Sequence, residues 1–149
     1  MAERRMPTAP QLRIWRDFIE TVADIQGELG RRLQDESGLS AADYSVLLAL
    51  SDESGHELRS SELALAIGWE RSRLSHHLGR MERRGLIRRD DCATDNRGAV
   101  IVLTEEGSTA FRRSNVPHLR AIHELFVQRL DDEQLQMVDE ITRALKTGA

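Results

Sequence analysis

The hydrophobic pattern of this chain changes its period at Gly85. Before that glycine, apolar residues recur at the three- and four-residue spacing of one helical face. After it, residues 86–89 and 99–103 have the composition of strands, and the polar segment 90–98 separates them. This order predicts a helix that ends at Gly85, followed by a β-hairpin whose loop is longer than a tight turn requires.

A second, shorter helix is expected just before this one. It begins at Ser60 or Ser61, ends at Ile67, and is followed by Gly68, which accommodates a left-handed backbone easily. Ala64 is small where two helices would cross. A helix, a glycine turn and a further helix form a helix-turn-helix, and the basic hairpin that follows directly makes this interpretation specific.

The residues before this motif predict two more helices. An apolar stripe indicates one long helix over residues 11–35. Ser40 and Asp43 have the spacing of a capping box, so the next helix is expected over residues 41–51. Residues 51–57 are expected to form a polar loop.

The residues after the hairpin also predict helices. Thr104 is a suitable N-cap, and an apolar stripe extends over residues 111–130 with a bend or interruption near Pro117. Asp131 and Gln134 form a second capping-box pattern, which begins a last helix.

The long amphipathic helices at the two ends cannot bury their apolar stripes on a small central domain alone. They pack either on each other or on a second copy of the chain. We favour the second interpretation, in which both ends form the interface of a helical dimer.

Charge is distributed unevenly along the 149 residues, whose formal net charge is −4. Residues 59–99 carry nine arginines and six acidic residues, so this segment is basic and the remainder is acidic. A basic segment between acidic ends is expected where one part of a chain faces a polyanion, although an excess of this size also falls within ordinary scatter. The polar face of the helix that ends at Gly85 carries side chains that suit base edges and phosphates: Arg71, Ser72, Ser75, His76 and Arg80.

Three motifs then follow in order: RRGLIRR at residues 83–89, DNRG at 95–98 and LTEEG at 103–107. With the preceding helices, the run from Leu63 to Gly107 resembles the winged helix of MarR-type transcriptional regulators. The flanking helices fit the same family over about residues 10–147.

The resemblance implies a mainly α fold with an α+β winged helix, in one domain over residues 1–149. Dimerisation helices are expected over residues 10–36 and 108–147, and a winged helix-turn-helix lobe over residues 40–104. The family implies a homodimer that binds double-stranded DNA at a palindromic operator, most often as a repressor.

The resemblance also transfers roles to individual residues. Arg97 matches the arginine at the tip of the wing, which suits a narrow minor groove, and Asp95 matches the aspartate that braces it. The spacing of His77 from its apolar neighbours also fits a half-buried side chain. The predicted DNA contacts are Arg71, Ser72, Arg73, Ser75, His76, His77, Arg80, Asp95 and Arg97.

Several residues near the predicted DNA contacts are not themselves expected to read DNA. Arg83 and Arg84 stand at a helix end, where cations complement the dipole, and are expected to be structural or solvated. Arg88 and Arg89 alternate on a strand, so at most one faces the DNA. Glu70 stands where a good N-cap residue is expected, and glutamate caps poorly.

Many members of the family bind a small aromatic or anionic effector in a cleft, and Trp15, Phe18 and Tyr44 are the residues expected to line it here. No cofactor, metal site or catalytic residue is expected, so the chain is not predicted to be an enzyme. The single cysteine, Cys92, is interpreted as a small packing residue. Without a signal peptide or an apolar run of about 20 residues, the protein is expected to be cytoplasmic and not bound to a membrane.

Two alternatives to a ligand-controlled regulator remain for the winged helix. In the first it is a protein-interaction module, and in the second it binds DNA without control by a ligand. An exposed apolar face over residues 71–80 would favour a protein partner, whereas the polar and basic face there favours DNA.

Overall fold

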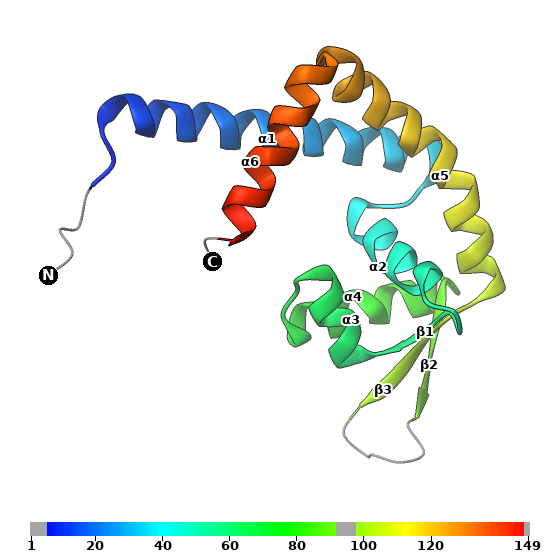
Figure 1. Cartoon of the computed structure of the whole chain (residues 1–149). Coiled ribbons are helices and arrows are strands. Elements are labelled where there is room, and N and C mark those ends of the chain that lie inside the picture. Colours follow the sequence, from blue (N-terminus) through cyan, green and yellow to red (C-terminus); the bar gives the residue numbers. More distant parts are fainter. Residues whose placement is uncertain (1–5, 92–97, 148–149) are drawn as a thin grey trace, which may run out of the picture. The chain divides into compact units, whose positions relative to one another are not determined.

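The computed structural model describes residues 6–91 and 98–147 (Figure 1). The helices are α1 (Ala9–Ser37), α2 (Ala41–Asp52), α3 (Ser60–Ile67), α4 (Arg71–Arg83), α5 (Glu105–Leu125) and α6 (Asp132–Thr147), with the short 3₁₀ helix η1 (Val127–Arg129). The strands are β1 (Glu57–Arg59), β2 (Ile87–Asp91) and β3 (Ala99–Leu103). The predicted fold class, mainly helical with a small winged sheet, is confirmed.

The chain divides into two compact units. One is formed by Arg32–Leu119, and the other by the two ends of the chain, up to Arg31 and from Arg120. The first unit contains the helix-turn-helix and the sheet. None of the helices in the described part of the chain is both long and apolar enough to cross a membrane.

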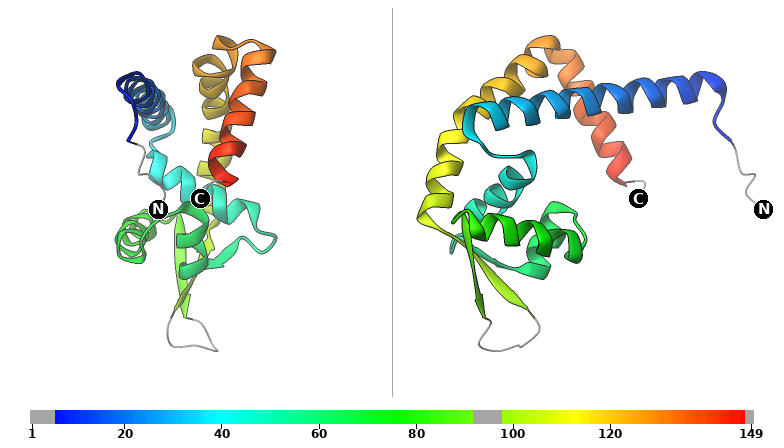
Figure 2. Two further views of the ribbon diagram at one scale, coloured as in Figure 1. Left: turned by 60° about the vertical axis from the view of Figure 1, so that its left-hand side comes forward. Right: turned by 180° about the vertical axis from the view of Figure 1, so that it is seen from behind.

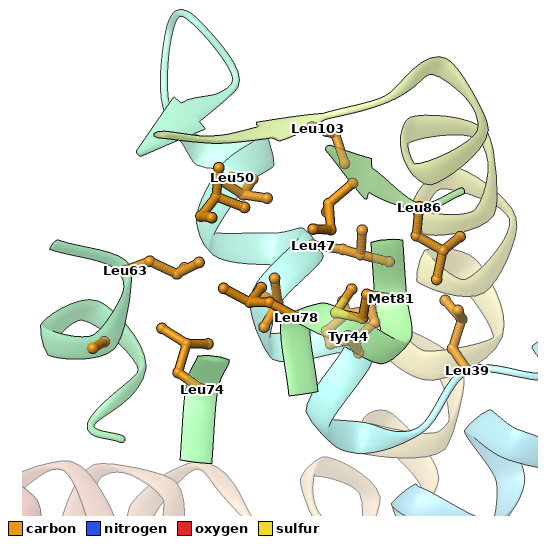
Figure 3. Close-up of a cluster of buried hydrophobic side chains, with 14 of the residues drawn as sticks. Leu39, Tyr44, Leu47, Leu50, Leu63, Leu74, Leu78, Met81, Leu86 and Leu103 are labelled. Atoms are coloured by element: carbon orange, nitrogen blue, oxygen red, sulfur yellow. The ribbon is translucent and has the colours of Figure 1, made fainter. Parts of the chain in front are cut away.

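The core of the first unit lies between α2, α3, α4 and the sheet (Figure 3). Leu47 and Leu50 come from α2, Leu63 from α3 and Met81 from α4, and each has 0% of its surface exposed. Burying such side chains is the main favourable term in folding, so this core fixes where the exposed face of α4 points.

Both helices of the helix-turn-helix end at a glycine with a left-handed backbone, as expected. Gly68 has φ +68°, and the N–H of Trp69 donates to the carbonyl of Ala64 at 2.9 Å. Gly85 has φ +75°, and the N–H of Leu86 donates to the carbonyl of Met81 at 3.1 Å. These backbone hydrogen bonds satisfy the last carbonyl groups of α3 and α4 and turn the chain sharply after each helix.

The sheet has the order β1-β3-β2, and both pairs of strands are antiparallel. The predicted hairpin is present, with Ile87 opposite Leu103 and Asp91 opposite Ala99. It extends away from the helices of this unit (Figure 2). The sequence did not predict β1, a strand of three residues that pairs with β3 more than forty residues later.

The terminal helices differ from expectation in two respects. Of the bend or interruption expected near Pro117, the interruption is wrong, because α5 continues through this residue. The apolar stripe expected to extend to Leu130 leaves the α-helix at Leu125 and enters η1. A proline removes one backbone donor, and the turns on either side keep the helix continuous. The second capping box is confirmed, because the N–H of Gln134 donates to Asp131 at 2.8 Å and the N–H of Asp131 to Gln134 at 3.0 Å.

The start of α5 is fixed against the end of α4. The hydroxyl of Thr104 donates to the carbonyl of Gly85 at 2.6 Å and accepts from the N–H of Gly107 at 3.0 Å. Gly107 lies so close to the backbone of Leu86 that an added Cβ atom would overlap its carbonyl oxygen and lie 2.9 Å from Leu103. Glycine is therefore required at this position by the close approach of two backbones.

We predict that Gly107→Ala lowers the free energy of unfolding by about 2–3 kcal/mol, since the backbone of Leu86 must move to admit the methyl group. Gly55→Ala is the matched control, because its added Cβ would make an ordinary contact of 3.6 Å with Glu57. We expect that control to stay within about 0.5 kcal/mol of the wild type. Urea unfolding of both variants measures the difference, and equal stabilities would contradict the close approach.

Candidate DNA interface

The exposed face of α4 brings together six of the predicted DNA-contacting residues. Leu74, Leu78 and Met81 anchor the helix in the core, as the spacing predicted. The opposite face is exposed and carries Arg71, Ser72, Arg73, Ser75, His76 and Arg80. These side chains combine cations with small polar groups over about three turns of one helix, which suits a helix in a major groove.

Arg73 is held by an aromatic ring. Its guanidinium lies 4.1 Å from the centroid of the Trp69 ring. Arginine stacked on an aromatic face keeps its outward N–H groups available for hydrogen bonds. Trp69 thus supports one of the cations of the exposed face from the turn before α4.

The expectation that His77 contacts DNA requires correction, because the structure places this side chain in the interior. Only 7% of its surface is exposed. Its Nε2 lies 3.0 Å from a carboxylate oxygen of Asp43, and its Nδ1 lies 2.9 Å from a guanidinium nitrogen of Arg80. Three residues after Leu74 and four before Met81, His77 falls on the buried side of the helix.

Burial lowers the pKa of His77 below 6.5, although the neighbouring Asp43 carboxylate opposes this effect. The imidazole is therefore neutral at neutral pH. A neutral ring has one nitrogen that donates and one that accepts.

Asp43 is a buried carboxylate at the first turn of α2. It accepts a hydrogen bond from Arg84 at 2.7 Å and one from the N–H of Ser40 at 2.9 Å. Arg84 also donates to the carbonyl of Gly38 at 2.9 Å. The structural role expected of Arg84 is thus confirmed, whereas Asp43 was expected only to cap its helix. We call Ser40, Asp43, His77, Arg80 and Arg84 the Asp43 cluster.

The pKa of Asp43 reflects two opposing effects. Burial alone would raise it, but the hydrogen bond and charge of Arg84 and the N–H of Ser40 outweigh burial and hold the pKa below 3.8. Asp43 is therefore ionised at neutral pH, where its partners stabilise the charge.

The strands of the hairpin use their arginines differently. Arg89 of β2 donates from its side chain to the carbonyl of Ser75 at 2.8 Å, and its N–H donates to Glu82 at 3.1 Å. Arg88 instead pairs with Asp90 at 3.0 Å in solvent. The expected alternation is present, and Arg89 ties the hairpin to the middle of α4.

Three residues with predicted roles lie outside the described residues. They are Cys92, Asp95 and Arg97 in the segment between β2 and β3. The roles predicted for them stay predictions. Glu70 is the N-cap residue of α4, and its side chain makes no capping hydrogen bond, as expected.

The three residues predicted to bind an effector lie in different units. Trp15 and Phe18 are on α1 in the terminal unit, with 60% and 50% of their surfaces exposed. Tyr44 is buried in the winged unit, where its hydroxyl donates to Asn115 at 2.8 Å and its ring packs against Phe111 and His118. Burial raises the pKa of Tyr44. The effector site stays a prediction.

A groove that the sequence did not indicate lies on the winged unit, between α2, β1 and α3. It has a volume of about 760 Å³, and none of the predicted DNA or effector residues lines it. Leu65 at its edge has 84% of its surface exposed. In the described segments, no three histidine, cysteine, aspartate or glutamate side chains are placed together to hold a metal ion.

A helix-turn-helix with a polar, cationic recognition face and an adjoining hairpin defines the class of winged-helix proteins. A family model described as MarR family matches residues 37–98. The transcriptional regulator HosA of Escherichia coli O127:H6 is 31% identical over 107 residues, which are 72% of this chain and 77% of HosA. The chain belongs to the MarR family. The prediction that it is not an enzyme is confirmed by this membership.

Two solved structures are similar over nearly the whole chain. The MarR-family regulator Sco3205 of Streptomyces coelicolor, solved in complex with DNA, is 36% identical with a TM-score of 0.91, over 99% of this chain and 92% of its own. AbsC of the same organism is 33% identical with a TM-score of 0.88, over 97% of each chain. The transcriptional repressor MprA of Escherichia coli K12 is 28% identical over 108 residues, which are 72% of this chain and 61% of MprA.

We predict that Asp43→Asn lowers the free energy of unfolding at pH 7 by about 2–3 kcal/mol, because Arg84 and His77 lose their anionic partner. This is less than a fully buried pair would lose, since the Arg84 side chain is 45% exposed. Because the pKa of Asp43 is lower in the folded protein than in the unfolded chain, its ionised form stabilises the fold above the unfolded-state pKa. This stabilisation is lost as the pH falls through the folded-state pKa. The difference between wild type and variant should therefore shrink below about pH 4.

The matched control is Asp90→Asn, which removes an exposed carboxylate paired with Arg88. We expect little change in its unfolding free energy at any pH. Urea unfolding between pH 3 and pH 7 measures both variants. A difference for Asp43→Asn that stays constant across this range would contradict the lowered pKa.

Proposed function

We propose that the protein is a sequence-specific DNA-binding transcriptional regulator that acts as a homodimer. The observation that carries this proposal is the exposed face of α4, where cationic and small polar side chains stand on a helix anchored by a leucine core. Cations neutralise phosphates and supply affinity, and short polar side chains next to base edges supply specificity. Sco3205, which is similar over 92% of its own length, was solved in complex with DNA.

In this arrangement α4 enters the major groove. We assign base contacts to Ser72, Ser75 and His76, and phosphate contacts to Arg71, Arg73 and Arg80. We also assign a minor-groove contact to Arg97, with Asp95 as the residue that braces it. An apolar face on α4 would have favoured the alternative of a protein-interaction module.

Homodimerisation is supported by the apolar side chains that the terminal helices leave exposed. Trp15 and Phe18 on α1 are half exposed or more, and Ile141 and Leu145 on α6 have 48% and 66% of their surfaces exposed. Large apolar surfaces of this kind mark interaction sites. A twofold dimer presents two recognition helices, which suits a palindromic operator.

The direction of control and the effector complete the proposal. We propose repression, which is the activity in the printed name of MprA, a relative of lower identity. Release from DNA by a small aromatic or anionic ligand at Trp15, Phe18 and Tyr44 is proposed from the family resemblance. A mobility shift with DNA flanking the coding region, repeated over a salt titration, tests DNA binding itself.

We predict that Arg97→Ala and His76→Ala affect binding differently. Arg97→Ala removes a cation from each subunit, so the slope of log affinity against log salt should become shallower by roughly 2, with weaker binding to all sequences. His76→Ala should leave the slope nearly unchanged and relax discrimination at one base pair per half-site by on the order of 1–3 kcal/mol.

Salt-titrated binding to an operator and to its single-base variants measures both effects. Wild-type affinity and slope for Arg97→Ala would contradict the proposed contact of the hairpin with the minor groove. Unchanged discrimination by His76→Ala would contradict base contact by His76.

We also predict that removing residues 131–149 yields a monomer or an aggregate and abolishes tight operator binding, because the exposed stripes lose their partner. Ile141→Glu keeps the chain complete and should shift the protein toward monomer. Gln136→Glu adds the same charge on the polar side of α6 and is the control, with the oligomeric state unchanged. Light scattering measures the mass, and a soluble dimer after truncation would refute the terminal interface.

A further inference from the structure

We propose that His77 is a positioning residue for DNA binding, which holds the guanidinium of Arg80 on the exposed face of α4. This inference rests on the proposed function and goes beyond it, since it assigns a role to a buried side chain that does not touch DNA. Its basis is the chain of contacts through the Asp43 cluster.

The contact with Arg80 selects one tautomer of the imidazole. A guanidinium has only donors, so the Nδ1 that lies 2.9 Å from Arg80 must be unprotonated and accept. Because burial keeps the ring neutral and Nδ1 accepts, the proton is on Nε2, which lies 3.0 Å from a carboxylate oxygen of Asp43. The ring is thus the neutral Nε2–H form, with its acceptor directed at Arg80.

Asp43 is itself fixed by other groups. One of its oxygens accepts from Arg84 and from the N–H of Ser40, at 2.7 and 2.9 Å, which leaves the other oxygen to face His77. The N–H of Asp43 donates to the hydroxyl of Ser40 at 3.0 Å in the capping box of α2. A rigid helix start therefore orients the imidazole, as a carboxylate orients a histidine in many sites.

The imidazole is also packed from the side. The rings of Trp69 and His77 meet edge to face, with centroids 5.5 Å apart and an angle of 79° between their planes. Only 7% of His77 is exposed, whereas Arg80 is exposed beside it. The ring is thus a buried support for a side chain on the surface.

Holding Arg80 improves binding because a free arginine has many rotamers. Fixing such a side chain on binding costs conformational free energy, and a residue that restrains it beforehand reduces this cost. Arg71 is the contrast on the same face, since the described residues offer it no hydrogen-bond or ion-pair partner. Arg80 is therefore the cation of α4 that His77 prepares for a phosphate.

Protonation of His77 would remove this support. The charged groups that face the ring are Asp43 from α2 and Arg80 and Arg84 from α4, and burial keeps the ring neutral at pH 7. At acid pH an Nδ1–H would point a donor and a positive charge at Arg80. The contribution of His77 to DNA affinity should therefore be present at neutral pH and disappear as the ring protonates, below the ordinary histidine range.

The experiment compares two amides at position 77. The side chain of His77→Asn has an oxygen near the place of Nδ1 and still accepts from Arg80, whereas that of His77→Gln extends toward Asp43 and loses the Arg80 contact. We expect His77→Gln to weaken binding to a duplex selected by the wild type from a random pool, by up to the factor of Arg80→Ala, roughly tenfold. His77→Asn should retain most of the affinity.

A double-mutant cycle isolates the contact. In an Arg80→Ala background, His77→Gln should have no further effect on affinity or on the salt slope, while in an Arg71→Ala background its effect should persist. Nitrogen NMR of the wild type, which needs no variant, should show an unprotonated Nδ1 at pH 7. Urea unfolding records stability separately, so a variant that is merely unstable is recognised.

Several outcomes would overturn the proposal. These are equal affinities for the two amides, a full effect of His77→Gln without Arg80, or the opposite tautomer. If Arg80→Ala binds like the wild type, there is no contact to position and the inference fails, while His76 and Arg97 still test the proposed function. If the wild type selects no duplex, the proposed function fails as well.

Discussion

One buried carboxylate determines how the helices of the winged unit meet. Asp43 lies at the first turn of α2, and it binds the end of α4 through Arg84 and the middle of α4 through His77. A carboxylate removed from water is strongly unfavourable unless several donors surround it. Arg84 and Ser40 donate hydrogen bonds to one oxygen of Asp43, and Nε2 of His77 lies 3.0 Å from the other. These directional contacts and the apolar core together hold α4 in place relative to α2.

The hairpin depends on that position of α4. Arg89 binds the carbonyl of Ser75 and Thr104 binds the carbonyl of Gly85, so the strands leave the helix from two fixed points. Gly107 allows the start of α5 to reach the backbone of Leu86. The recognition helix and the base of the hairpin are therefore one rigid body, which a protein needs if it is to contact two grooves of DNA with a defined spacing.

The local features of this body could be predicted from the sequence, because each depends on neighbouring residues. The left-handed glycines at 68 and 85, the capping box of Ser40 and the change of period after Gly85 all follow from short-range rules. The strand β1 could not be predicted in this way, because three residues carry no alternation and their partner lies in β3. Nor could the helix through Pro117, because its continuity depends on how the surrounding turns compensate for one lost donor.

In the candidate site, too, the features that depend on neighbouring residues could be predicted, and those that depend on distant residues could not. The exposed face of α4 follows from the helical period, which also indicated that His77 is partly buried. The partner of His77 could not be predicted, because Asp43 is thirty-four residues earlier in the sequence. The spacing of Asp43 from Ser40 indicated only a helix cap. Long-range polar pairs have no sequence period, so the connection between the cap of α2 and the surface of α4 appears only in the structure.

Because of these contacts, the cationic side chains of α4 differ in how strongly they are restrained. Arg73 is restrained by the ring of Trp69 and Arg80 by His77, and Trp69 and His77 are themselves in contact. Arg71, at the start of the helix, has neither support. Restrained cations bind a phosphate at a lower entropic cost and at a fixed place, which sets the register of the helix on the duplex. An unrestrained cation adapts to any phosphate, and thus contributes to the search along non-specific DNA more than to the final register.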